Sequence, residues 1–130
     1  LRAMEARFAT HKITEAALDR MAVLVEALAN GLELDVREQL AIAREFDIEI
    51  ERAAANPTLR SMILSLSIIG QERRARTVAS LHLRPEVGLQ RVQDHRDMLA
   101  AFRNRDPDLV EQVFRRHATA GVELHLEDLD

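Results

Sequence analysis

Three ionisable side chains occupy positions where the sequence pattern predicts apolar ones. Asp47, His95 and His117 each lie on the apolar face of a different predicted helix. A buried charge without a partner costs free energy, so such groups are usually paired, hydrogen-bonded or bound to a metal. Because three helices each direct one such side chain inward, the sequence predicts a polar pocket inside a helical bundle, and we expect the functional site there.

The same three residues also have a structural interpretation. A histidine on an apolar face is most often a core residue that has found a hydrogen bond, and Asp47 has the chemistry to pair with an inward arginine or a protonated imidazole. In metal-free protein, a nearby Asp47 is expected to favour the protonated form of His95 or His117, because an opposite charge stabilises the charged form. The pocket would then present positive donors to an anionic ligand.

Arginines near these positions are candidates for holding such a ligand. Arg73 follows Ile69 by four residues, so we expect it to point inward, and Arg74 is next to it. Arg91 lies one helical turn before His95. A guanidinium offers parallel donors that match a carboxylate. We therefore predict ligand contacts from Arg73, Arg74 and Arg91, the structural alternative being a solvated basic face.

Apolar residues recur at helical spacing along the whole chain. The expected helices span residues 1–11, 14–30, 35–54, 57–81, 88–104 and 107–126. Four typical N-cap residues precede helical patterns, and proline follows two of them. They are Thr14, Asp35, Asn56 and Asp106. The short connections favour an all-α antiparallel bundle of six helices, or seven if the fourth breaks near Gly70, with an internal ligand pocket.

The pattern also predicts which faces are buried and where one connection lies. Met4 and Phe8, together with Leu1, are expected to form the apolar side of the first helix. The third and fourth helices are expected to bury further apolar residues, among them Leu40, Met62 and Leu66. Residues 82–87, which contain Pro85, are expected to connect the fourth helix to the fifth.

Composition limits the classes of function. A chain of 130 residues is expected to form one domain. Its net charge of −4 makes it a poor candidate for holding a nucleic-acid backbone by itself. The absence of cysteine excludes disulfides and fits a cytoplasmic protein, and no apolar run is long enough to span a membrane. Because the sequence does not begin with methionine, we expect it to be part of a longer protein.

Several motifs, in order along the chain, resemble one known family. They are residues 46–59 with Phe-Asp and Asn-Pro-Thr-Leu, residues 94–101 with Asp-His-Arg, the Arg-Asp pair at 105–106, and Arg-His at 116–117. The opening residues 1–12 fit the same pattern. Together they resemble the effector-binding (FCD) C-terminal domain of FadR-subfamily GntR transcription regulators, and the resemblance covers essentially the whole chain.

The resemblance implies an all-helical domain that binds a small organic acid and often a divalent metal held by one aspartate and three histidines. His95 and His117 match two of those ligands. Asp47 stands where the family usually has a histidine, and Ala43 stands where it has the aspartate. The resemblance therefore implies a site for Zn or Ni formed by Asp47, His95 and His117, with one ligand fewer than usual. A metal-free pocket is the alternative.

The resemblance further implies a homodimer whose contact with DNA is made by an N-terminal winged helix-turn-helix domain that residues 1–130 lack. No Gly-rich phosphate loop, nucleophile elbow or HExxH motif is present, so we expect a regulator and not an enzyme. The alternative function is a small metal-dependent enzyme in a helical bundle, with Asp47, His95 and His117 as a facial triad. A purely structural interaction bundle is the third interpretation.

Overall fold

The computed structural model describes residues 1–66 and 85–129, with side chains up to residue 118 apart from those of Val36 and Pro85. This part of the chain is helical with short connections and contains no strand, which confirms the predicted all-α class. The helices are α1 (Arg2–Ala9), α2 (Glu15–Asn30), α3 (Val36–Ala54), a helical segment at 57–66, α5 (Pro85–Arg103) and α6 (Pro107–Leu129). None of these helices is long and apolar enough to cross a lipid bilayer.

Side-chain caps set the starts of the helices. The side chains of Thr14 and Asn56 each accept a hydrogen bond from the backbone N–H three residues later, at 3.1 and 3.0 Å. Asp106 accepts one from the N–H two residues later, at 3.0 Å. Asp35 accepts a longer one, at 3.4 Å, from the N–H of Arg37. The four predicted N-caps are therefore confirmed, because each satisfies an amide that the helix leaves unpaired.

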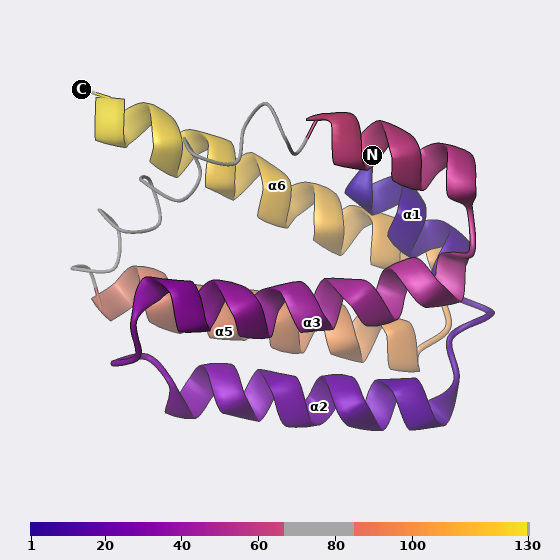
Figure 1. Ribbon diagram of the computed structural model, residues 1–130, viewed down its shortest axis with the longest axis horizontal. Helices are drawn as coiled ribbons and strands as arrows, with labels where there is room; N and C mark the ends of the chain where they lie inside the picture. The colour runs from indigo at the N-terminus through magenta and orange to yellow at the C-terminus, as the bar shows by residue number, and fades with distance from the viewer. Residues whose placement is uncertain (67–84, 130) are drawn as a thin grey trace.

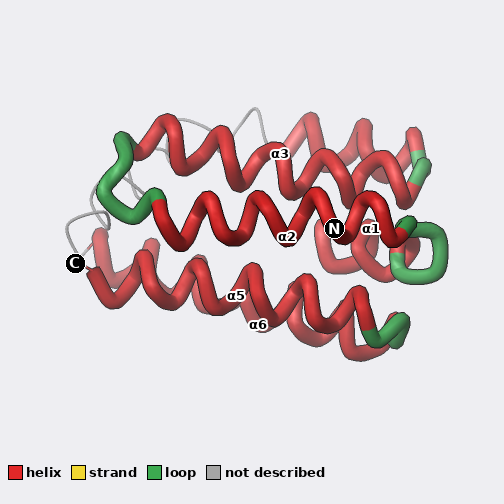
Figure 2. Tube along the Cα trace, turned by 90° about the horizontal axis from the view of Figure 1, so that it is seen from below, coloured by secondary structure: helices red, strands yellow, loops and turns green. Residues whose placement is uncertain are grey.

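The five labelled helices form a closed ring of contacts. Helix α1 packs against α3 and α6, α2 packs against α3 and α5, and α5 packs against α6. Figure 1 shows α2 and α3 running antiparallel beneath α6 and α1, and Figure 2 shows α2 between α3 and α5. Side chains from every helix of the ring therefore meet in one interior, and the buried His95 lies there.

Large apolar side chains fill that interior. Phe46 of α3 and Phe102 of α5 are fully buried, and the rings of Phe102 and Phe114 meet edge to face at 5.8 Å. Met21 of α2 and Val110 of α6 are also fully buried. The core thus joins four helices, and α1 is added to it through small residues.

The predicted face of α1 is wrong. Leu1, Met4 and Phe8 are 44%, 45% and 48% exposed, whereas Ala6 and Ala9 are completely buried. The alanine side of the helix has no bulky side chains, so it permits a close approach to α3 and α6. A prediction from the spacing of large apolar residues therefore assigned the exposed face of this short helix to the core.

Two further predictions need correction. Helix α5 begins at Pro85, not at Gly88, so Pro85 does not lie in a connection. Proline suits the first position of a helix because its missing N–H would have no helical acceptor there. Leu40, Met62 and Leu66 are 37%, 50% and 60% exposed and not buried as predicted. In the helical segment 57–66 the buried positions are Leu59 and Ile63, as expected from the same apolar spacing.

Candidate functional site

Two of the predicted site residues meet in the interior. His95 of α5 is 5% exposed, and its ring packs edge to face against Phe46 at 5.0 Å and against His117 of α6 at 5.7 Å. His117 is less buried, with 39% of its side chain exposed. The ring of helices therefore brings together side chains that are 22 residues apart in the sequence.

Hydrogen bonds fix the orientation of both imidazoles. His95 Nδ1 lies 2.8 Å from the backbone oxygen of Arg91, and His117 Nδ1 lies 3.0 Å from the carboxylate of Asp94. A carbonyl or carboxylate oxygen only accepts, so each Nδ1 carries the proton. Each Nε2 is then free to use a lone pair when the ring is neutral. Donation from one ring nitrogen to an acceptor is also the usual arrangement around metal-bound histidine.

Burial keeps His95 neutral. Desolvation lowers its pKa from 6.5 to about 4, and the bond to the Arg91 oxygen offsets only part of that shift. His117 and the Arg91 guanidinium lower it further. The expectation of a His95 protonated by a nearby Asp47 is therefore wrong, because desolvation dominates and the carboxylate that raises its pKa is Asp94.

Asp47 of α3 lies near this pair but faces a different partner. Its carboxylate is 3.4 Å from Arg2 Nη1, and 30% of its side chain is exposed. Desolvation raises its pKa, and Arg2, Arg44 and His117 act in the opposite direction. Asp47 thus interacts electrostatically with His117, but its direct contact in the structure is an ion pair with Arg2 of α1.

Arg91 is a partly buried cation with an uncharged partner. Its Nη1 donates to Gln39 Oε1 at 3.0 Å, and the same amide donates to the backbone oxygens of Leu32 and Leu34 at 3.3 and 3.0 Å. Burial lowers the pKa of Arg91. Within residues 1–66 and 85–118, no carboxylate forms an ion pair with it. This site presents a desolvated positive charge next to His95.

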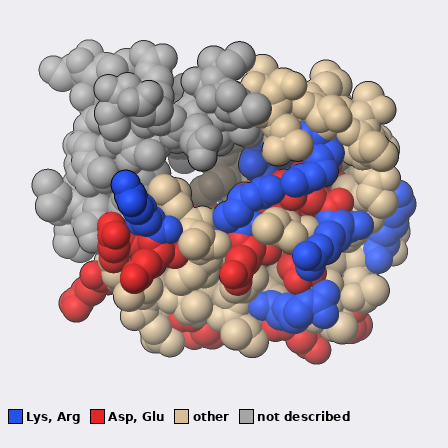
Figure 3. Space-filling model, viewed as in Figure 1, with Lys and Arg blue, Asp and Glu red and all other residues tan. Residues whose placement is uncertain are grey.

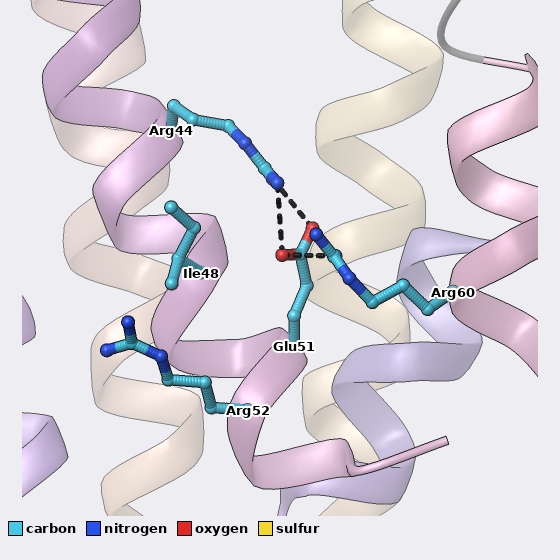
Figure 4. A pocket seen from close by; sticks show the side chains of 5 residues that line it. All are labelled: Arg44, Ile48, Glu51, Arg52 and Arg60. Carbon is cyan, nitrogen blue, oxygen red and sulfur yellow. Dashed lines mark hydrogen bonds and ion pairs between the residues drawn. The ribbon is translucent and has the colours of Figure 1, made fainter. Parts of the chain in front are cut away.

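Two open grooves lie along α3. One, of about 350 Å³, is lined by Arg44, Ile48, Glu51, Arg52 and Arg60 (Figure 4). The other, of about 550 Å³, lies between α2 and α3. Neither is lined by the histidine pair, so the predicted internal pocket around His95 and His117 stays a prediction. Arg73 and Arg74 lie outside the described residues, so their predicted ligand contacts stay predictions.

Comparison with known proteins identifies the family. The family model for the FCD domain matches residues 2–120. The chain belongs to the FCD domain family. Among solved structures, McbR/YncC of E. coli is similar with a TM-score of 0.81 over 99% of this chain, at 19% sequence identity. This FCD domain spans 60% of the McbR/YncC chain, and the likeness concerns the fold alone. No curated protein sequence matches it.

Two histidines of the FCD domain have the orientation that metal ligands require. Both histidines have one nitrogen oriented by an acceptor, which fits ligation by the other. Within the described part of the chain, however, no three His, Asp or Glu side chains lie close enough together to hold a metal. Asp47 is turned to Arg2, and Ala43, one turn earlier, offers no donor. The two histidines fit a metal, whereas Asp47 would have to leave its ion pair.

Sequence reasoning missed a buried charge cluster in this FCD domain. Glu51 has only 4% of its side chain exposed and contacts Arg44 at 2.6 Å and also Arg60. Glu5 of α1 is 2% exposed, and burial and Glu51 raise its pKa. The seven-residue spacing of Arg44 and Glu51 was a visible signal, because it places both on one face of a helix. Nothing in the pattern of α1 indicated that Glu5 faces inward.

Proposed function

We propose that this FCD domain binds a small organic anion, with a carboxylate as the recognised group. It would do so as the effector domain of a FadR-type GntR transcription regulator. The partly buried Arg91 carries the proposal, since a desolvated guanidinium gains most from an anionic ligand when no carboxylate pairs with it, as is the case among the described residues. Family membership supports the regulatory role, because the resembled family uses this domain to sense organic acids.

The neighbouring groups suit such a ligand. Arg91 would donate to the carboxylate and supply the positive charge, since His95 is neutral. Phe46 supplies an apolar wall beside His95. The predicted contacts from Arg73 and Arg74 belong to the same proposal.

Binding at Arg91 would also affect the connection between α2 and α3. Gln39 links Arg91 to the backbone at Leu32 and Leu34, where α2 connects to α3. An anion that takes donors of Arg91 would change that link. If the two arrangements differ in affinity for the anion, binding shifts the population between them. In the complete regulator, the shift would alter DNA binding by the N-terminal domain.

The proposal is tested by a thermal-shift screen of small mono-, di- and tricarboxylic acids. We expect at least one acid to raise the melting temperature of the wild type and of Arg96→Gln, which changes an exposed arginine on the same helix. Arg91→Gln should respond less to that acid than the wild type, and Arg91→Lys should lie between the two. An undiminished response in Arg91→Gln would contradict the proposed site.

We also propose that His95 and His117 bind a divalent metal, Zn or Ni, with Asp47 as the third ligand after it leaves Arg2. A metal there would act as a Lewis acid that holds the ligand carboxylate. Mass spectrometry of protein purified without chelator or metal-affinity resin should find one equivalent, lost in His95→Ala and His117→Ala. His11→Ala, which changes an exposed histidine, should retain it. Absence of metal from the wild type would contradict metal binding by these residues, and the anion would then bind at Arg91 without a metal.

The remaining expectations belong to the complete regulator. We propose that it is a cytoplasmic homodimer and that it contacts DNA only through the N-terminal domain. We propose no catalytic role for the FCD domain. Turnover of a substrate by this domain would favour the enzyme alternative instead.

A further inference from the structure

A second group of arginines gathers on the outer side of α3. Arg44, Ile48, Glu51 and Arg52 are spaced along one face of that helix, and Arg60 approaches from the helical segment 57–66. Figure 4 shows Arg44 and Arg60 reaching Glu51 from opposite sides. The groove of about 350 Å³ between these side chains is separate from the site at Arg91 and His95.

The charges in this groove are distributed unequally between its floor and its walls. The side chain of Glu51 is 4% exposed, whereas those of Arg44 and Arg60 are 40% and 35% exposed. The carboxylate is therefore buried, whereas the two arginine side chains are partly exposed. Figure 3 shows basic side chains gathered in the middle of this face of the molecule, with acidic ones among them.

Other acidic groups near Glu51 lie on its inner side. Glu5 is 2% exposed, and Asp47 pairs with Arg2, which also lies 3.8 Å from Glu51. Neither Glu5 nor Asp47 lines the groove. Both lie on the α1 side of the cluster and partly balance the arginines there. Among the described residues that line the groove, Glu51 is the one carboxylate, while Glu49 acts on Arg52 from the neighbouring groove between α2 and α3.

The Glu51 carboxylate does not use all of the guanidinium N–H donors in the groove. Arg44 uses Nη1 and Nη2 on the Glu51 carboxylate, at 2.6 and 3.2 Å. Arg60 Nη1 touches the same carboxylate but is buried without a partner in hydrogen-bond geometry. Arg52 forms no hydrogen bond or ion pair with any described residue, and in Figure 4 its guanidinium points away from Glu51.

We propose that this groove binds a small organic anion at a second site, with the carboxylate or phosphate group on Arg52 and Arg44 and a short apolar part on Ile48. Three guanidiniums against one carboxylate leave positive charge for such a group, and planar donors suit either oxyanion. The volume fits a ligand of a few non-hydrogen atoms and lies at the lower end of the range for small-molecule sites. Arg60 and Glu51 would hold Arg44 in position.

Arg52 makes the proposal testable without disturbing the fold. Because it has no ion pair among the described residues, Arg52→Gln should leave the melting temperature unchanged. Arg37→Gln is the matched control, since it changes an exposed arginine on the same helix outside the groove. Amide NMR spectra of the 130-residue chain would be titrated with inorganic phosphate, acetate and butyrate.

We expect signals of residues 48, 52 and 60 to shift in a saturable way. Arg52→Gln should weaken binding about tenfold, and Arg37→Gln and Arg91→Gln should not weaken it. Tighter binding of butyrate than of acetate would assign the apolar wall to Ile48, and phosphate as the tightest probe would assign a phosphate ligand instead. Equal binding by wild type and Arg52→Gln, or no saturable shift at these residues, would overturn the proposal. Loss of all binding in Arg91→Gln alone would assign the anion to the first site.

Discussion

At the scale of single residues, the position of His95 decides which chemistry the interior can perform. Its ring is enclosed by Phe46 and His117, and its Nδ1 proton is held by a backbone oxygen of its own helix. A neutral imidazole oriented in this way offers a lone pair at Nε2 and no charge. The positive charge at this site therefore comes from Arg91, which is why we assign anion recognition to that residue.

The lowered pKa of His95 makes stability depend on pH. Between about pH 4 and 6.5 the unfolded chain binds a proton at this histidine and the folded chain does not. The free energy of unfolding should therefore fall as pH decreases from 6.5 to 4, by about 3 kcal/mol from this group. Above pH 6.5 the stabilising contribution of the neutral His95 is complete.

Urea unfolding of chelator-treated protein at several pH values measures this slope. His95→Gln should have a shallower dependence between pH 4 and 6.5, whatever its absolute stability. His11→Gln should keep the wild-type slope. A slope for His95→Gln as steep as that of the wild type would show that other groups cause the acid sensitivity.

The positions and contacts of these side chains could be predicted from the sequence only in part. The inward position of His95 followed from helical spacing, and its meeting with His117 followed from the two helices sharing one core. The ion pair of Asp47 with Arg2 did not, because it depends on which face α1 presents. The same rotation of α1 brings Glu5 beside Glu51, and large apolar residues at positions 1, 4 and 8 pointed to the opposite face.

At the scale of elements, one corner fixes how α5 and α6 meet the start of the chain. Arg105, in the turn after α5, has a left-handed φ of 55°, and Asp106 then caps α6. The Arg105 guanidinium donates to the backbone oxygens of Thr10, at 3.1 Å, and of Ile13. This is the Arg-Asp pair that the sequence singled out as a family motif, and its physical role is to join two connections 90 residues apart.

Arg105→Ala should destabilise the domain by about 2 kcal/mol, because partly buried carbonyls lose charge-assisted donors. Arg103→Ala is the matched control at the same corner. Its ion pairs with Glu15 and Asp19 are 3.5 Å long and exposed, so its loss should cost less than about 0.5 kcal/mol. Chemical denaturation measures both, and equal effects of the two variants would contradict the assigned role.

At the scale of the whole molecule, the closed ring of helices explains how residues far apart in sequence reach one interior. The all-α class and the caps that begin four helices could be predicted, since local pattern determines them. The start of α5 at Pro85 was missed because proline is compatible with both a connection and a first helical turn. The two grooves along α3 could not be predicted, because they arise where side chains of separate elements leave space.

The central claim is that a small organic anion binds at Arg91. Isothermal titration calorimetry with the acid that stabilises the domain most tests it directly. We expect the affinity of the wild type to be unchanged in Arg96→Gln and at least tenfold lower in Arg91→Gln. The same affinity in Arg91→Gln as in the wild type would contradict it.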